Sequence, residues 1–140
     1  MDHVDHHSLV GEVLKVLVGG LNPFVTQVFA RTLPPGTEWP DLLRAKDEVN
    51  GRRGGEYQSR DVALLLRVMT ERIGDLGFLF TRHMPRQAEN YARELRSVRN
   101  QWAHNGEFTA AEAFRAIDSA ELLLRAIGAE AEAKQVAQLK

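Results

Sequence analysis

Apolar residues along most of the chain recur at spacings of three and four, and strand-like alternation is nearly absent. This spacing places them on one face of a helix, so the pattern predicts an all-α protein. The two clearest stripes are Ala88, Tyr91, Leu95, Val98 and Trp102, and Ala113, Ile117, Ala120, Leu124 and Ile127. Helices with such stripes bury them against one another. We therefore expect an antiparallel up-and-down bundle of four to five helices, with Leu95, Val98, Trp102, Ile117 and Leu124 in its core.

Local signals predict where the helices of the first half begin and end. Ser8 is a possible N-cap of a first helix, which Gly19-Gly20 is expected to end. Asn22-Pro23 then predicts the start of a second segment, because proline suits the first turn of a helix. Ser59 or Asp61 opens a further helix.

The second half carries equally clear signals. Pro85 suits the start of the helix that ends in Trp102, and Asn105-Gly106 is typical of a helix end. Thr109 with Glu112 forms a capping box at the start of the next helix, which Gly128 closes.

Two segments fall outside the regular pattern. Residues 34–60 are rich in proline, glycine and charge, which predicts a long surface excursion with at most a short helix around Leu42–Glu48. Residues 129–140 favour a helix but are weakly amphipathic, so we expect an exposed helical tail or the lead-in to a further domain. Residues 1–128 are then one bundle domain.

The composition of the chain limits the kinds of site and partner that it can have. The 140 residues are 44% hydrophobic and 26% charged, with a net charge of −1, so any binding of nucleic acid must come from a local patch. The absence of cysteine excludes disulfides, thiolate catalysis and cysteine-based zinc sites, and favours a cytoplasmic location. The apolar runs look too short to span a membrane, and we find no signal peptide.

The most informative stretch is "RSVRNQWAHNGEF", residues 96–108. On a helix, Arg99 lies about 60° from the centre of the buried stripe and His104 about 160° from it. His104 thus points away from its own core, one turn after Asn100. Arginine, asparagine and histidine are also favourable in the last turn of any helix, so spacing alone leaves a purely structural interpretation open.

The segment "ELRSVRNQWAHNGEFTAAEAFRAIDSAELLLRAI" resembles the signature half of the HEPN superfamily, whose hallmark is an arginine followed by a polar residue and, four to six positions on, a histidine. Here these are Arg99, Asn100 and His104. The resemblance is to the branch fused to large ATPases and helicases of bacterial conflict systems and to a eukaryotic messenger-RNA quality-control endonuclease. It implies a ribonuclease that needs no metal or other cofactor, typically active as a homodimer, in a defence or toxin setting.

The implied chemistry suits these residues. Cleavage of RNA without metal needs a base for the 2′-hydroxyl, an acid for the departing 5′-oxygen, and positive charge at the phosphorus. His104 is suited to proton transfer and Arg99 to the phosphoryl oxygens. Asn100 could fix the tautomer of His104 or hold the phosphate. Arg96 is a candidate for a neighbouring RNA phosphate, although a solvated charge fits equally well.

Each chain supplies one motif histidine, and a symmetric dimer would supply two. The other partners implied are an antitoxin or a fused or associated ATPase, with no membrane. A non-catalytic HEPN module, which dimerises or binds RNA or a partner to regulate a larger ATPase or helicase, is the alternative.

The remaining candidate residues are weaker. His3 and His7 have the spacing of metal ligands, but a frayed terminus explains them better. Arg52 and Arg53 lie in a glycine-rich segment that could touch RNA backbone, with a solvated turn as the more ordinary interpretation. His83 is expected to be exposed or to cap a helix.

Overall fold

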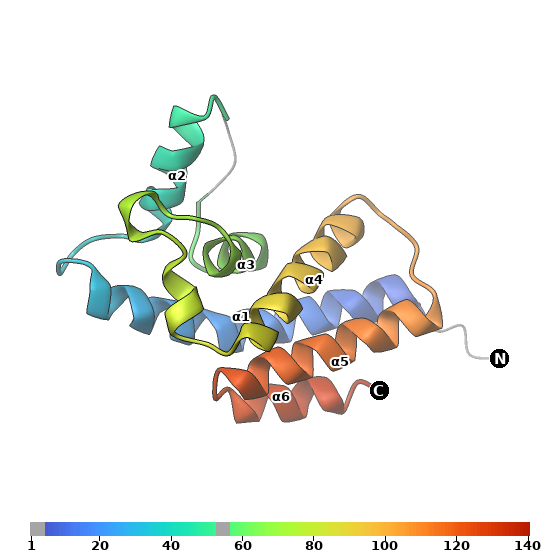
Figure 1. The fold of residues 1–140 in the computed structure, drawn as a ribbon. Coiled ribbons are helices and arrows are strands. Elements are labelled where there is room, and N and C mark those ends of the chain that lie inside the picture. The colour runs from blue at the N-terminus through green and yellow to red at the C-terminus, as the bar shows by residue number, and fades with distance from the viewer. Residues whose placement is uncertain (1–4, 53–56) are drawn as a thin grey trace.

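The protein is described by a computed structural model that covers residues 5–52 and 57–140. Within these ranges every regular element is helical, which confirms the predicted all-α fold (Figure 1). The elements are α1 (His6–Thr32), α2 (Pro40–Val49), α3 (Val62–Thr70), the 3₁₀ helices η1 (Gly74–Leu76) and η2 (Leu79–Arg82), α4 (Arg86–Ala103), α5 (Ala110–Ala126) and α6 (Glu130–Ala137).

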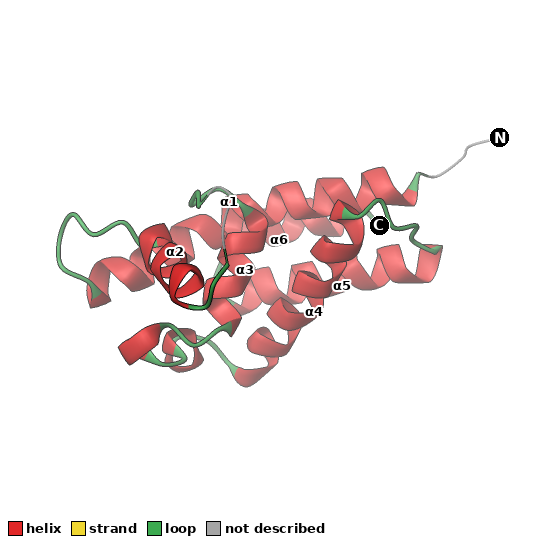
Figure 2. Ribbon diagram, turned by 90° about the horizontal axis from the view of Figure 1, so that it is seen from above, coloured by secondary structure: helices red, strands yellow, loops and turns green. Residues whose placement is uncertain are grey.

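The long helix α1 is the centre of the bundle. It packs against α3, α5 and α6, while α4 packs against α3 and α5. Figures 1 and 2 show α1, α5 and α6 lying alongside one another, with α4 crossing them obliquely and α2 set apart at one side. Leu95, Ile117 and Leu124 are fully buried as predicted, whereas Val98 and Trp102 are only partly buried at the edge of the core.

The predicted break at Gly19-Gly20 and Pro23 is wrong, because α1 runs through all three residues. Gly20 is buried where α1 meets the end of α5, and a Cβ there would clash with Leu124 and lie 3.2 Å from the Cβ of Ala129. The glycine therefore serves close packing. Pro23 costs the helix one backbone hydrogen bond, but buried residues on both sides of it keep the helix continuous.

The start of α1 also differs by one turn from the expectation. Asp5 is the N-cap, and its carboxylate accepts hydrogen bonds from the backbone N–H of Ser8 at 3.1 Å and from the Ser8 hydroxyl at 2.7 Å. Because α1 is unbroken, it is long and apolar enough to cross a membrane by length and composition, contrary to the sequence-based expectation. Nine of its residues are buried within the bundle, which explains its apolar character without a membrane.

Residues 34–60 and residues 129–140 both contribute buried side chains to the core, which their sequence patterns did not predict. Within residues 34–60, Trp39 stacks on Phe29 with ring centroids 5.5 Å apart, and Leu43 on α2 is fully buried. The last segment is helical, but the expected exposure is wrong: α6 packs on α5 and α1 and buries Ala133 and Val136 completely.

Candidate functional site

The end of α4 is fixed by a tight hydrogen-bonded turn. Asn105 adopts the left-handed conformation with φ 58°, its N–H donates to the Trp102 carbonyl at 3.1 Å, and the Gly106 N–H donates to the Gln101 carbonyl at 2.8 Å. These two bonds are the Schellman motif that commonly terminates helices. A Cβ on Gly106 would lie 2.5 Å from Gln101 Cγ, so the turn requires glycine there. The predicted helix end is confirmed.

The three motif residues, Arg99, Asn100 and His104, lie in the last turn and at the C-cap of α4, and each is at least partly accessible to solvent. His104 is the C-cap of α4, and both His104 and Asn100 are exposed, while Arg99 is half-buried. Within the described residues, none of the three side chains makes a hydrogen bond or ion pair. The structure brings Asn100 and His104 to one face of α4, one turn apart, whereas Arg99 points about 140° away from His104. One α4 helix therefore does not bring Arg99 and His104 together.

Unlike Arg99, Asn100 and His104, Arg96 is held in an ion pair within the chain. Its guanidinium donates to Glu71 at 2.6 Å and, more weakly, to the Thr70 hydroxyl at 3.4 Å. The contact with RNA predicted for Arg96 would require this ion pair to open.

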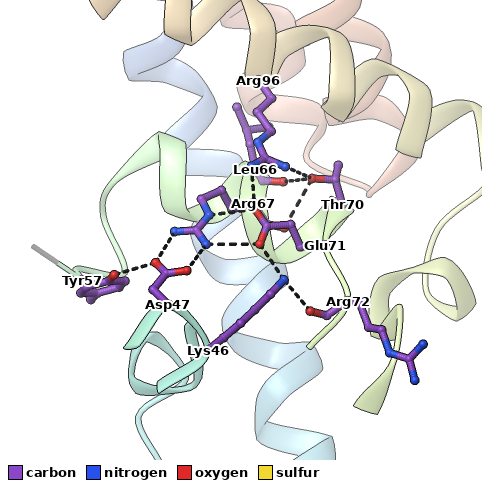
Figure 3. A network of polar contacts seen from close by, with 9 residues as sticks. All are labelled: Lys46, Asp47, Tyr57, Leu66, Arg67, Thr70, Glu71, Arg72 and Arg96. Atoms are coloured by element: carbon purple, nitrogen blue, oxygen red, sulfur yellow. Dashed lines mark hydrogen bonds and ion pairs between the residues drawn. The ribbon is translucent and has the colours of Figure 1, made fainter. Parts of the chain in front are cut away.

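Glu71 is the centre of a polar network that joins α2, α3 and α4 (Figure 3). Arg67 donates to both carboxylate oxygens of Asp47, at 2.8 and 2.9 Å, and its Nε donates to Glu71 at 2.8 Å. Lys46 donates to Glu71 at 2.8 Å, and the Tyr57 hydroxyl donates to Asp47 at 2.6 Å. Asp47 is 4% exposed, so its carboxylate is removed from water, whereas Lys46 and Arg96 at the edge of the network are partly exposed.

The network changes the proton affinities of its carboxyl groups. Hydrogen bonds from Arg67 lower the pKa of Asp47 to about 2, against the opposing effect of burial. Burial alone would raise the pKa of Glu71, but hydrogen bonds from Arg67 and Lys46 outweigh it and lower that pKa to about 2. The hydrogen bond to Asp47 raises the pKa of Tyr57. Both carboxylates are thus held ionised, and their role is to fasten α4 to α2 and α3.

Two histidines that sequence reasoning did not connect to the motif lie at the same end of α4. His7 Nε2 is 3.0 Å from the Trp102 carbonyl, the Trp102 indole N–H donates to the His7 carbonyl at 3.1 Å, and the two rings stack at 5.3 Å. His6 Nδ1 is 3.0 Å from the Phe108 carbonyl. The first turn of α1 is therefore hydrogen-bonded to Trp102 and Phe108, the residues on either side of the turn that ends α4.

A concave pocket of about 580 Å³ opens between the first turn of α1 and the turn that follows His104. It is lined by Asp5, His6, His7, Asn105, Gly106, Glu107 and Phe108. Its size falls in the range of small-ligand sites. A second pocket of similar size, about 540 Å³, is lined by Trp102, Lys15 and Arg60 among other residues.

The weaker sequence candidates gain no support as sites. His3 and Arg53 lie outside the described residues. A ring nitrogen of His7 is engaged by Trp102, and within residues 5–52 and 57–140 no group of three or more acidic, histidine or cysteine side chains could hold a metal ion. Arg52 and His83 are exposed, His83 at the end of η2.

The family model for Swt1-like HEPN matches residues 12–128. No curated protein and no solved structure matches the chain. The matched region runs from within the first turns of α1 to just past the end of α5, so it includes Arg99, Asn100 and His104 and leaves out His6 and His7. Because this match covers most of the chain, the protein belongs to the Swt1-like HEPN family.

Proposed function

We propose that the protein is a metal-independent endoribonuclease that cleaves RNA through attack of the 2′-hydroxyl. Family membership supports a ribonuclease-like or RNA-binding module. The observation that carries the finer proposal is the exposure of Asn100 and His104 at the end of α4, with no partner for either side chain among the described residues. Histidine and an adjacent amide left free in this way can contact a phosphodiester.

Each motif side chain has a distinct role in this proposal. His104 transfers a proton to or from the reacting oxygens. Arg99 stabilises the charge that develops on the phosphorus centre. Asn100, one turn before His104, orients the imidazole or binds a phosphate oxygen. Since Arg99 and His104 diverge on the helix, we propose that Arg99 of one chain acts with His104 of a second copy.

This arrangement predicts a homodimer in solution. Sedimentation at micromolar concentration should report about twice the 15.7 kDa chain mass. A charge-reversal variant, Arg99→Glu, should shift the distribution toward monomer if the ends of α4 meet, whereas Arg86→Glu at the opposite end of α4 should not. A strictly monomeric wild type would contradict the dimer.

The proposed activity predicts cleavage of RNA but not DNA in the presence of EDTA. DNA lacks the 2′-hydroxyl nucleophile, so an RNA and a DNA of the same sequence form a matched pair. A chimera with one ribonucleotide in a DNA strand should be cut only beside that residue. Binding of RNA without products under any condition would instead favour the non-catalytic module that regulates a larger protein.

Further parts of the proposal rest on family resemblance alone. They are a defence or toxin setting and control by an antitoxin or by a fused or associated ATPase. The proposed cytoplasmic location rests instead on the absence of cysteine.

A further inference from the structure

We infer that the 540 Å³ pocket at Trp102 binds one nucleotide of the RNA, next to the phosphate that Arg99 contacts. The inference rests on the proposed ribonuclease function and adds a substrate-binding site to it. None of the three motif residues lines this pocket. The pocket would therefore hold the RNA without taking part in the chemistry.

The pocket lies on the side of α4 that carries Arg99. Trp102 lines the pocket and contacts the first turn of α1, and Arg96 pairs with Glu71 at the end of α3. Arg99 lies between them, three residues from each, and residues at that spacing have Cβ atoms about 5–6 Å apart. His104 points to the other side of α4, as expected if the histidine that acts with Arg99 comes from a second copy.

One part of the pocket wall is apolar. It is formed by side chains of α1, α3 and α4, namely Leu14, Val18, Val62 and Trp102. The indole of Trp102 lies close to the backbone of α1, because Gly11 has no side chain and a Cβ there would be 3.1 Å from Trp102 Nε1. Flat nucleobases bind to apolar and aromatic surfaces of this kind.

The rest of the wall is charged. Lys15 and Arg60 are exposed, and neither makes a hydrogen bond or ion pair within the part of the chain that the structure describes. The carboxylate of Asp61 is engaged, because it caps α3 and accepts from the Ala63 N–H at 3.0 Å. Glu12 is exposed and opposes an anion. Free cations beside an apolar wall suit a phosphate joined to a base.

The 580 Å³ pocket is a poorer site for RNA. The carboxylates of Asp5 and Glu107 line it, and its described lining residues include no lysine or arginine. Phosphate is repelled by carboxylates and attracted by free cations. The charge distribution therefore favours the pocket at Lys15 and Arg60.

Trp102 can report directly on occupancy of the pocket. The chain has two tryptophans, and the other, Trp39, is buried against Phe29, so Trp39→Phe leaves one indole in the protein. The probe is a hexanucleotide with 2′-O-methyl groups throughout, which lacks the nucleophile and cannot be cut. It should change the Trp102 emission in a saturable way. Unchanged emission, while a dye-labelled hexamer binds by anisotropy, would overturn the inference and leave the proposed function standing.

Charge variants in the otherwise wild-type chain, read by anisotropy, separate the pocket from general attraction. Lys15→Ala and Arg60→Ala should each weaken binding of the hexamer and reduce the slope of log Kd against log salt by about 0.7. Glu12→Gln should strengthen binding. Arg86→Ala removes an exposed cation at the other end of α4 and should change neither quantity. Equal weakening by Arg86→Ala and Lys15→Ala would overturn the inference.

The contribution of the base and the effect on cleavage are tested separately. An abasic hexamer with the same phosphates should compete poorly with the intact hexamer, because the apolar wall holds the base, and equal competition would overturn the inference. On unmodified RNA, Lys15→Ala should raise KM with little change in kcat. A wild type that binds the hexamer at Trp102 but cuts no RNA in EDTA would overturn the proposed ribonuclease and still support the nucleotide site.

Discussion

Replacing His104 with alanine is expected to lower the rate of RNA cleavage by about 10²–10⁴-fold. The imidazole is the proposed proton donor, and no other group on its face of α4 can replace it. The side chain is exposed and makes no hydrogen bond within the described residues, so the fold should be unaffected. Initial rates on one RNA, with helix content from circular dichroism, measure both effects.

Arg99→Ala should be comparably damaging, because the guanidinium stabilises the phosphorane. The chain offers matched controls for both changes. His83 and Arg86 are exposed residues remote from the end of α4, and their alanine variants should cleave RNA at the wild-type rate. Equal losses in His83→Ala and His104→Ala would contradict the assignment of the site.

The second large effect concerns stability. Arg67→Ala should lower the free energy of unfolding by about 3–5 kcal/mol, the range for breaking one partner out of a buried ion pair. The substitution leaves Asp47 and Glu71 without the three hydrogen bonds at 2.8–2.9 Å that Arg67 supplies. Arg93→Ala removes an exposed i,i+4 pair with Glu89 on α4, and it should cost only about 0.2–0.5 kcal/mol. Urea denaturation of both variants makes the comparison.

The same network predicts a loss of stability in acid. The pKa values of Asp47 and Glu71 fall to about 2 in the folded protein, from ordinary values of 3.8 and 4.5. A lowered carboxyl pKa gives stability that is fully present above the unfolded-state pKa and is lost as pH falls toward the folded-state value. Unfolding free energy should therefore decrease between about pH 5 and pH 2. Arg67→Ala should show a shallower decrease, and an equally steep one would contradict the role of this network.

The parts of the fold that depend on local sequence were predictable. The stripes of α4 and α5 follow from residue spacing, and the capping box of Thr109 and Glu112 is formed as expected. The end of α4 is likewise a local property of Asn105 and Gly106. These signals depend on residues a few positions apart, so the structure that they predict does not depend on how the rest of the chain folds.

The errors arise where distant residues decide the structure. Gly20 looks like a helix end, but its partners Leu124 and Ala129 lie more than 100 positions away. Asp47 looks like a surface residue until Arg67 is placed against it. The position of His6 depends on the Phe108 carbonyl, which no pattern of side chains reveals. The motif itself was visible in the sequence, whereas the groups around it required the fold.

The most direct measurement is identification of the new ends produced when purified protein cuts RNA in EDTA. Mass spectrometry of the fragments should show 2′,3′-cyclic phosphate or 3′-phosphate on one side of each cut and 5′-hydroxyl on the other, because the RNA supplies its own nucleophile. His104→Ala protein, prepared in the same way, should leave the RNA intact. Fragments with 5′-phosphate and 3′-hydroxyl ends, or the same fragments from His104→Ala, would contradict the proposed chemistry.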